Sequence, residues 1–417
     1  MLSMPWASAS GQAASPLTAL FTATSAVCVT GLVVVDTGTY WSVAGQTVIL
    51  FLIQIGGLGI MTVSTLVGLA AGRRIGLRER LTLREQLGGI PLEGATHLIR
   101  YVVVMTLGFQ FLGLLIMSAR LWGDHPLGKA SYLGLFHSIS AFNNAGFDLF
   151  TTSLEGFRAD PTMNAITTLL IIAGGLGFLV LVDLYSWIRW RSPLNLHSRV
   201  VLAVSGALLV LGMSVVLIGE HSNPATLAGR PLGERLMASW FHSVTPRTAG
   251  FNTLPTGDLN SVTQFFTMAL MFVGGSPGST AGGVKTTAFL VLILALMAGI
   301  TGRKDLESFH RRLSWQVVNR ALAIVLLAGF LVFSVTLLLL ATERADFLTT
   351  FFEAVSAFGT VGLSMGLTPD LSAAGRLIVI VTMFVGRVGP LTMAAAIALR
   401  QRKQADIRKP EDKVILG

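Results

Sequence analysis

The sequence predicts an all-α integral membrane protein of four tandem repeats around a central pore. Its 417 residues are 52% hydrophobic and 12% charged, with a mean hydropathy of +0.70, whereas soluble domains carry about 25% charged residues. This composition excludes a soluble or a disordered chain. Cys28 is the only cysteine, which excludes a disulfide scaffold. The net charge of +9 implies no nucleic-acid partner, because membrane proteins collect Lys and Arg on their cytoplasmic side.

Apolar segments of two lengths alternate along the chain. The long ones can cross a hydrocarbon core of about 30 Å as helices. They cover residues 43–71, 98–119, 163–187, 200–219, 265–299, 318–341 and 377–399. The short ones, of about a dozen residues, are expected to be re-entrant half-helices because they cannot span alone. They cover residues 16–27, 130–142, 232–245 and 346–358.

Each short segment ends in a turn that contains a glycine, and the sequence around this glycine recurs. The four glycines are Gly31, Gly146, Gly250 and Gly362. A serine precedes three of them by six residues, at Ser25, Ser140 and Ser356, and a glycine pair follows in each next long segment. In the last pair Arg387 replaces the second glycine. These registers predict four tandem helix–half-helix–turn–helix (M1-P-M2) repeats.

The predicted domains are the four repeats and a cytosolic tail. They cover residues 1–73, 97–191, 197–304, 317–400 and 401–417. The first repeat lacks its outer helix, since residues 1–5 resemble only the end of one. An unsupported half-helix would expose polar backbone to lipid. We therefore favour a late start of this sequence over trimming or a real loss of that helix.

The distribution of basic residues predicts the orientation. Most lysines and arginines follow the second helix of a repeat, within residues 73–100, 189–199, 303–320 and 400–413. The positive-inside rule makes these segments cytoplasmic. The half-helices and their turns are then expected on the extracytoplasmic side of the plasma membrane.

The four turns are candidates for a cation-selective filter. Irregular backbone at membrane depth occurs only where it is buried in protein or faces water, and glycine lets successive carbonyls point inward. A ring of carbonyls can replace the water around a monovalent cation such as K+, towards which the half-helices would direct their negative dipole ends. The candidate ion-binding residues are Val29, Thr30, Gly31, Asn144, Ala145, Gly146, Thr248, Ala249, Gly250, Thr360, Val361 and Gly362. The alternative, a helix C-cap at each glycine, leaves the fourfold recurrence unexplained.

Several motifs resemble the Trk/Ktr/HKT potassium transporter superfamily. Residues 142–147 (FNNAGF), 245–251 (TPRTAGF) and 356–363 (SAFGTVGL) resemble its filter regions, and residues 55–59 (IGGLG) and 385–391 (VGRVGPL) its second-helix motifs. The likeness extends over nearly the whole chain and is greatest to the bacterial Ktr membrane (ion-translocating) subunit. Glycine at all four filter positions implies, by this resemblance, a preference for K+ over Na+.

The resemblance also implies a function and partners. It implies K+ uptake by channel-like conduction in a homodimer with one pore per protomer. It implies control by a cytosolic nucleotide-binding regulatory ring (a Ktr-type RCK subunit), with nucleotide on that partner only, and Na+ as a candidate activator. It implies no covalent cofactor.

A polar stretch at residues 274–286 interrupts the fifth long segment. Its glycines and Pro277 would strongly destabilise a helix, so a continuous helix is not expected here. Val284 separates the Gly-Lys pair that a phosphate-binding loop requires. The resemblance places an intramembrane gating loop here, and a kinked helix packed through small residues is the alternative. The candidate gate residues are Gly274, Gly275, Ser276, Pro277, Gly278, Ser279, Thr280, Gly282, Gly283, Lys285 and Arg387.

Charged side chains within the spans are functional candidates, because a cation at membrane depth is costly. Arg387 is expected either to form an electrostatic barrier below the filter or to bind the gating loop; the alternative is a structural ion pair with a carboxylate. Lys285 either lies in the membrane or extends to the cytoplasmic interface. Arg247, inside the third turn, is expected to support the filter from behind.

Two other classes of function are weighed against a channel. A sodium- or proton-coupled secondary transporter would need ionisable groups along its path and inverted repeats, whereas these repeats run parallel. A membrane enzyme would need a catalytic or metal-ligating cluster within the spans, and none is visible. We therefore predict no enzymatic activity.

Overall fold

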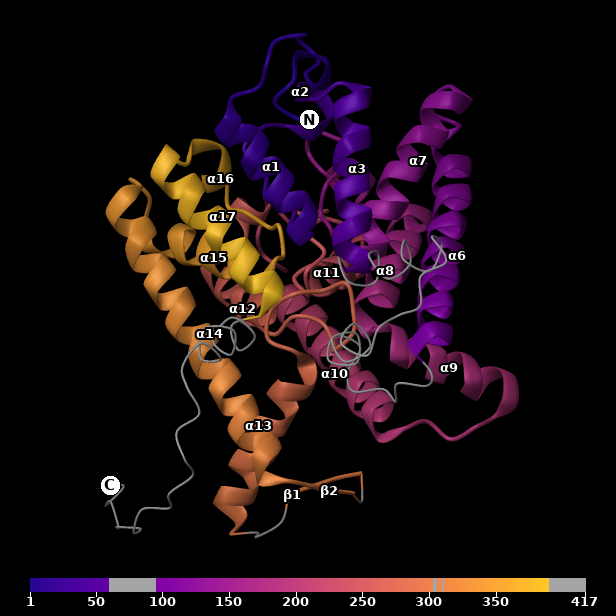
Figure 1. Cartoon of the computed structure of the whole chain (residues 1–417), viewed down its shortest axis with the longest axis vertical. Helices are drawn as coiled ribbons and strands as arrows, with labels where there is room; N and C mark the ends of the chain where they lie inside the picture. The colour runs from indigo at the N-terminus through magenta and orange to yellow at the C-terminus, as the bar shows by residue number, and fades with distance from the viewer. Residues whose placement is uncertain (60–94, 303–305, 310, 390–417) are drawn as a thin grey trace.

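A computed structural model describes residues 1–59, 95–302, 306–309 and 311–389 (Figure 1). The described chain is mostly helical. Its helices are η1 (Pro5–Ala7), α1 (Pro16–Cys28), α2 (Thr37–Tyr40), α3 (Val43–Leu58), α6 (Ala95–Leu121), α7 (Leu127–Phe142), η3 (Glu155–Phe157), α8 (Pro161–Leu176), α9 (Phe178–Trp190), α10 (Leu196–Gly219), α11 (Leu232–Val244), η4 (Thr256–Asp258), α12 (Ser261–Phe272), α13 (Thr286–Thr301), α14 (Trp315–Thr342), α15 (Phe347–Gly359), α16 (Leu367–Asp370) and α17 (Ala373–Val388). Strands β1 (Leu306–Ser308) and β2 (Arg311–Leu313) form an antiparallel hairpin in which Leu306 is opposite Leu313.

Three described helices are long and apolar enough to cross a membrane unbroken. They are Tyr101–Leu121 within α6, all of α10 and all of α14, with mean hydropathies of 2.1, 2.6 and 2.8. They correspond to the predicted segments 98–119, 200–219 and 318–341. Side chains such as Val104, Phe111 and Phe330 are exposed on their outer faces, as expected for helices that contact lipid.

The prediction of one continuous span over residues 163–187 is wrong. The helix breaks at Gly177, and α8 and α9 are bent by 107° relative to each other. Gly177 has a φ of +94° and lies so close to another segment that a Cβ would be 2.7 Å from the carbonyl oxygen of Pro277. The amide of Phe178 donates to the carbonyl of Gly278 at 3.0 Å. The break is thus fixed by a tertiary contact, which hydropathy does not register.

The other three second helices also stop early among the described residues. Residues 273–285 separate α12 from α13, as the polar stretch predicts. α3 and α17 end at glycines of positive φ, Gly59 and Gly389. The rest of the predicted spans 43–71 and 377–399 lies outside the described residues. So do residues 60–73, 303–304 and 390–400 of the predicted repeats and the tail 401–417.

The four short helices α1, α7, α11 and α15 coincide with the predicted half-helices and are largely buried. Each contacts the second helix of the preceding section of chain: α7 contacts α3, α11 contacts α8, and α15 contacts α12. α1 contacts α17, so the beginning and the end of the described chain lie side by side (Figure 1). These contacts close the four sections into a ring.

Close approach between these elements depends on glycine. A Cβ at Gly56 would overlap the carbonyl oxygen of Val27 at the end of α1. A Cβ at Gly174 or at Gly386 would likewise overlap a carbonyl oxygen near the end of α7 or of α15. The first glycine of three second-helix pairs therefore serves to bring helix backbones together.

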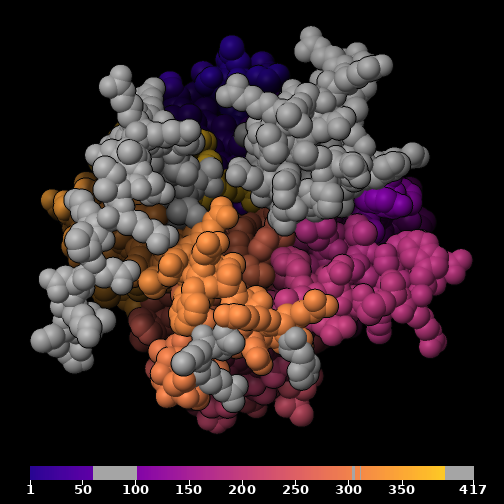
Figure 2. All heavy atoms as spheres, turned by 60° about the horizontal axis from the view of Figure 1, so that its bottom comes forward, coloured from indigo at the N-terminus to yellow at the C-terminus, as the bar shows by residue number. Residues whose placement is uncertain are grey.

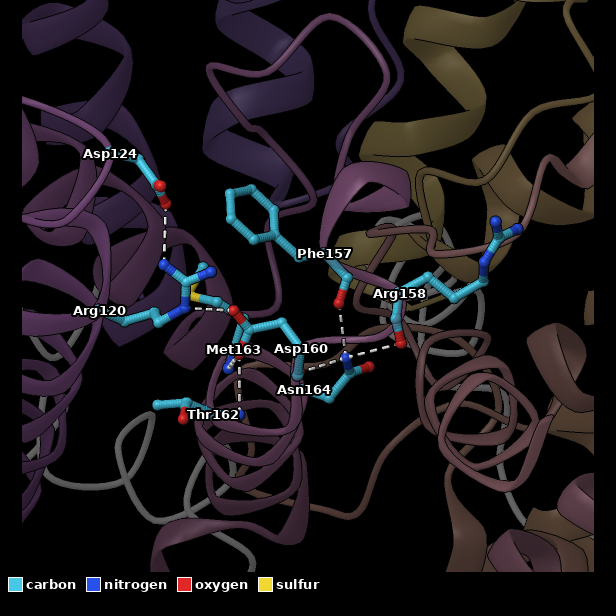
Figure 3. A network of polar contacts seen from close by, with 8 residues as sticks. All are labelled: Arg120, Asp124, Phe157, Arg158, Asp160, Thr162, Met163 and Asn164. Atoms are coloured by element: carbon cyan, nitrogen blue, oxygen red, sulfur yellow. Dashed lines mark hydrogen bonds and ion pairs between the residues drawn. The ribbon is translucent and has the colours of Figure 1, made fainter. Parts of the chain in front are cut away.

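A polar network joins α6 to α8 on the side where the short helices begin (Figure 3). Arg120 at the end of α6 forms an ion pair with Asp160. Asp160 also caps α8 by accepting from the amides of Thr162 and Met163, both at 3.0 Å. Asn164 donates to carbonyl oxygens of the preceding turn. Asp160 thus anchors both the start of α8 and its position against α6.

We expect Asp160→Ala to lower the thermal unfolding temperature of the purified protein, because loss of the cap alone costs about 1 kcal/mol. Asp124→Ala is the matched control, since Asp124 also pairs with Arg120 but is 54% exposed and caps no helix. Unfolding followed by intrinsic fluorescence should show a clear decrease for the first variant and little change for the second. Equal midpoints for both variants would contradict this role of Asp160.

Candidate functional site

The backbone has the same conformation in the turn that follows each of the four short helices. The residue two positions before each turn glycine is left-handed: Val29, Asn144, Thr248 and Thr360 have φ values of 57°, 57°, 76° and 51°. The glycines Gly31, Gly146, Gly250 and Gly362 are left-handed too, at 88°, 67°, 80° and 94°. The residues between, Thr30, Ala145, Ala249 and Val361, are not in the positive-φ region. This shared alternation lets successive carbonyls face one side of the chain.

A hydroxyl group on three of the short helices, and one directly after α11, fixes the turn that follows. In two turns the glycine amide donates to a serine on the helix, and in the other two a hydroxyl donates to the carbonyl that follows the glycine. The pairs are Gly31 with Ser25 (3.1 Å), Gly362 with Ser356 (3.2 Å), Ser140 with Phe147 (2.6 Å) and Thr245 with Phe251 (2.5 Å). The recurrent serine in the sequence therefore has a structural reason.

The four turn glycines form a closed ring of backbone contacts. A Cβ on Gly31 would lie 2.5 Å from the carbonyl oxygen of Ala145, and one on Gly146 would lie 2.9 Å from that of Ala249. A Cβ on Gly250 would lie 2.5 Å from the carbonyl oxygen of Val361. Gly362 closes the ring, because its Cβ would overlap the carbonyl oxygen of Thr30. Each glycine thus faces the carbonyl that precedes the next glycine.

Arg247 lies within the third turn, directly before Thr248, and is 9% exposed. Its guanidinium donates to the Ser205 hydroxyl at 3.0 Å and to the Ser205 carbonyl at 3.4 Å. These bonds tie the third turn to α10.

The polar stretch 274–286 forms a loop whose base is fixed by backbone pairing. Val273 and Val284 form a parallel bridge, and the Gly274 amide donates to the Val284 carbonyl at 2.9 Å. The Thr286 amide donates to the Gly275 carbonyl at 3.2 Å. The loop is therefore an ordered excursion between α12 and α13, and the kinked continuous helix is not observed.

The loop reaches two other sections of the chain. Its Ser276 and Thr280 amides donate to the carbonyls of Gly175 and Gly174 at the end of α8, at 3.1 and 3.2 Å. A Cβ at Gly282 would overlap the Thr360 hydroxyl, so the loop lies directly against the fourth turn. The remaining loop residues Pro277, Gly278, Ser279 and Gly283 complete this excursion, in which Gly278 and Gly283 have positive φ.

Arg387 on α17 joins the loop to the first section of the chain. Its guanidinium donates to the carbonyl oxygens of Thr280 in the loop and Gly56 in α3. Among the described residues it forms no ion pair with a carboxylate. Of the interpretations offered by the sequence, binding to the loop is the one observed.

Lys285 turns back into the same loop. Its ammonium group donates to the Ala281 carbonyl at 2.6 Å. The side chain therefore binds the base of the loop and does not extend to the interface.

Sequence reasoning missed Glu353, one of two residues that hold the segments beyond the turns. Glu353 is fully buried on α15 and accepts from the Ser364 hydroxyl at 2.8 Å and from the Thr368 hydroxyl at 2.5 Å. His137 on α7 binds the Leu133 carbonyl and accepts from the Leu149 amide. Both precede their turn glycine by nine residues, so aligning the turns would have brought Glu353 to notice beside His137. The described residues contain no cluster of three metal-ligating side chains, and His137 has a structural partner.

The family of this chain follows from a comparison with known proteins. The family described as "TrkH: Cation transport protein" matches residues 2–407. The chain belongs to the TrkH family. The resemblance predicted from sequence motifs is thereby confirmed.

Individual TrkH-family relatives match the chain over nearly its whole length. It is 44% identical over 399 residues to the Ktr system potassium uptake protein B of Bacillus subtilis, covering 96% of this chain and 89% of the relative. It is 38% identical to the potassium/sodium uptake protein NtpJ of Enterococcus hirae, covering 100% of this chain and 93% of the relative. The solved structure of the potassium transporter TrkH from Vibrio parahaemolyticus superposes with a TM-score of 0.71 at 20% identity, over 92% of this chain and 79% of that one. These relatives are transporters, in agreement with the prediction that this TrkH-family chain is a membrane protein and not an enzyme.

We expect Arg387→Gln to loosen the loop, since the shorter side chain cannot donate to both carbonyls. Loss of two charge-assisted hydrogen bonds should speed amide exchange at Ser276 and Thr280 by about tenfold or more. Hydrogen–deuterium exchange of the purified protein measures this change. Arg376→Gln is the control, because Arg376 lies on the same helix but donates to carbonyls of Leu371 and Pro369. Equal exchange in the wild type and Arg387→Gln would show that Arg387 does not hold the loop.

Proposed function

We propose that the chain takes up K+ across the plasma membrane by channel-like conduction through the four turns. The observation that carries the proposal is the closed ring of left-handed glycines, each facing the carbonyl before the next glycine. The names of the relatives, which are potassium or potassium/sodium uptake proteins, support K+ as the cargo.

The ring provides the chemistry that a monovalent cation requires. Backbone carbonyls from four symmetric positions can replace the hydration shell without a charged side chain. The short helices end at these carbonyls and direct their negative dipole ends at the ion. The hydroxyl bonds from Ser25, Ser140, Thr245 and Ser356 hold the carbonyls in place. In this proposal the four sections are M1-P-M2 repeats around one pore, and the filter opens to the extracytoplasmic side.

The loop at residues 274–286 is proposed as the gate. It lies against the fourth turn and is held by α8 on one side and by Arg387 on the other. A loop held by a few hydrogen bonds can rearrange at low cost compared with a helix. The Arg387 guanidinium adds a positive charge on the same path, which raises the barrier for a cation.

The proposed assembly is a homodimer controlled by a cytosolic nucleotide-binding ring. The "Ktr system" name of the Bacillus relative indicates a system with more than one component. We propose that nucleotide binds only to that partner and that Na+ acts as an activator. A sodium- or proton-coupled secondary transporter is the alternative, and the flux experiment below distinguishes it.

We expect Gly362→Ser to impair K+ selectivity, because its side chain would overlap the Thr30 carbonyl. A change of about 1.4 kcal/mol in coordination is tenfold in preference, and we expect the K+ preference over Na+ to fall at least that far. The measurement is flux of K+, Rb+ and Na+ into liposomes that hold the purified chain, with the cytosolic ring added.

The matched control is Gly366→Ser. Gly366 is also left-handed, at +100°, but a Cβ there meets nothing within 4 Å. This variant should retain the preference. Flux that requires an imposed proton gradient, or no discrimination between the ions in the wild type, would overturn the channel proposal.

We expect Arg387→Gln to raise K+ flux in the absence of the cytosolic ring. The variant removes a positive charge from the path and releases the loop, and both changes favour an open gate. A bias of about 1 kcal/mol corresponds to about fivefold in flux. The same liposome measurement with Arg376→Gln as control tests it. Unchanged or lower flux in correctly folded Arg387→Gln would contradict a gating role.

A further inference from the structure

Helix α9 has an orientation that the membrane-spanning helices do not share. It follows the 107° bend at Gly177 and lies across the lower part of the molecule, whereas α6 and α14 run along the long axis (Figure 1). Viewed from below, the magenta part of the chain that includes α9 projects at one side (Figure 2). A helix that lies across the direction of the spanning helices has the orientation of a helix in the membrane interface.

The exposed side chains of α9 are those of an interfacial helix. Trp187, Ile188 and Trp190 are 50%, 68% and 64% exposed, whereas Phe178 and Leu181 at its beginning are buried against the protein. Trp at the headgroup level anchors membrane proteins. Large apolar side chains that are exposed together on a short helix mark a surface that contacts a membrane or another protein.

The charge of α9 indicates which lipid headgroups would bind to it. Arg189 and Arg191 are exposed and form no ion pair with any described residue. The one carboxylate of the helix, Asp183, is occupied by the amide and side chain of Asn195. Two arginines next to two tryptophans therefore face outward as an uncompensated basic and aromatic surface. Anionic headgroups complement this surface, and neutral headgroups do not.

α9 is also joined directly to the intramembrane loop. The first amide of the helix, at Phe178, donates to the carbonyl of Gly278 at 3.0 Å. Gly177 approaches the Pro277 carbonyl so closely that any side chain would overlap it. A displacement of α9 relative to the membrane is thus transmitted to the loop at Pro277 and Gly278.

We infer that α9 binds anionic phospholipids of the cytoplasmic leaflet through Arg189 and Arg191, and that this contact steadies the loop through the bond between Phe178 and Gly278. The lipid site stands on the exposure, charge and orientation of α9. Its place in the cytoplasmic leaflet and its effect on ion flux rest on the proposed function, with the filter on the extracytoplasmic side and the loop as the gate.

Tryptophan quenching by brominated lipids tests the site. The full chain is titrated with brominated phosphatidylglycerol or brominated phosphatidylcholine, and the difference from Trp187→Phe/Trp190→Phe isolates the signal of α9. Each arginine near an anionic surface contributes about fivefold in affinity. We expect phosphatidylglycerol to be preferred by about tenfold or more in the wild type, and the preference to disappear in Arg189→Gln/Arg191→Gln.

Two control variants separate local from general charge effects. Arg189→Lys/Arg191→Lys keeps the charge and should keep most of the preference. Lys129→Gln/Arg344→Gln removes the same charge from exposed positions outside α9 and should leave it unchanged. Equal affinity for the two lipids in the wild type, or an unchanged preference in Arg189→Gln/Arg191→Gln, would overturn the site and favour a protein partner on this face.

Hydrogen–deuterium exchange at Phe178 and Ser276 tests the link to the loop. In the wild type, exchange should be slower in phosphatidylglycerol than in phosphatidylcholine, and Arg189→Gln/Arg191→Gln should lose this difference. Lipid binding at α9 without such protection would overturn the link. Absence of K+ flux in every lipid, with the protection intact, would overturn the proposed function and leave the lipid site standing.

Discussion

The structure depends on satisfying the backbone at the ends of four short helices that terminate inside a membrane protein. An unpaired backbone group in hydrocarbon costs roughly several kcal/mol, so these ends need protein around them. Gly56, Gly174 and Gly386 let the second helices cover three of the ends at backbone distance. Further contacts, between each short helix and the second helix of the neighbouring section, draw the turns together and close the ring from α1 to α17. Packing and the arrangement of the turns therefore have one cause.

The third section of the chain departs from this arrangement. Its corresponding glycine, Gly274, lies against Gly282 of its own loop and not against the end of a short helix. The second helix unwinds there, and the chain passes between α8 and the fourth turn before α13 begins. One loop of the third section thereby contacts the second and the fourth sections of the ring. Because the symmetry is broken at this point, the loop at residues 274–286 can influence the whole ring.

The sequence predicts the helices and the turns of this fold well because both are repeated. Three of the Gly-containing turns recur with a serine six residues before the glycine, and a second-helix glycine follows each of the four turns at a similar distance. The structure assigns a hydrogen bond to each serine and a close backbone contact to the second-helix glycine. The bend at Gly177 is not predictable from hydropathy, since α8 and α9 together are apolar enough to read as one span. The partners of Arg387 are backbone carbonyls, which every residue possesses and no sequence pattern marks. Cytoplasmic features predicted within residues 60–94 and 390–417 lie outside the described residues.

The left-handed residues before the glycines show where the ring stores strain. Val29, Thr248 and Thr360 are β-branched and disfavour positive φ, and a residue held there costs about 1 to 3 kcal/mol. Asn144 tolerates this conformation better. Such a conformation persists only where surrounding contacts determine it, as the helix bonds of the Val29 and Thr360 amides do here. Since each turn faces the next, relaxation of one would remove the contact that confines its neighbour. The four turns are therefore held as a unit, and the loop against Thr360 contacts that unit at one of its strained residues.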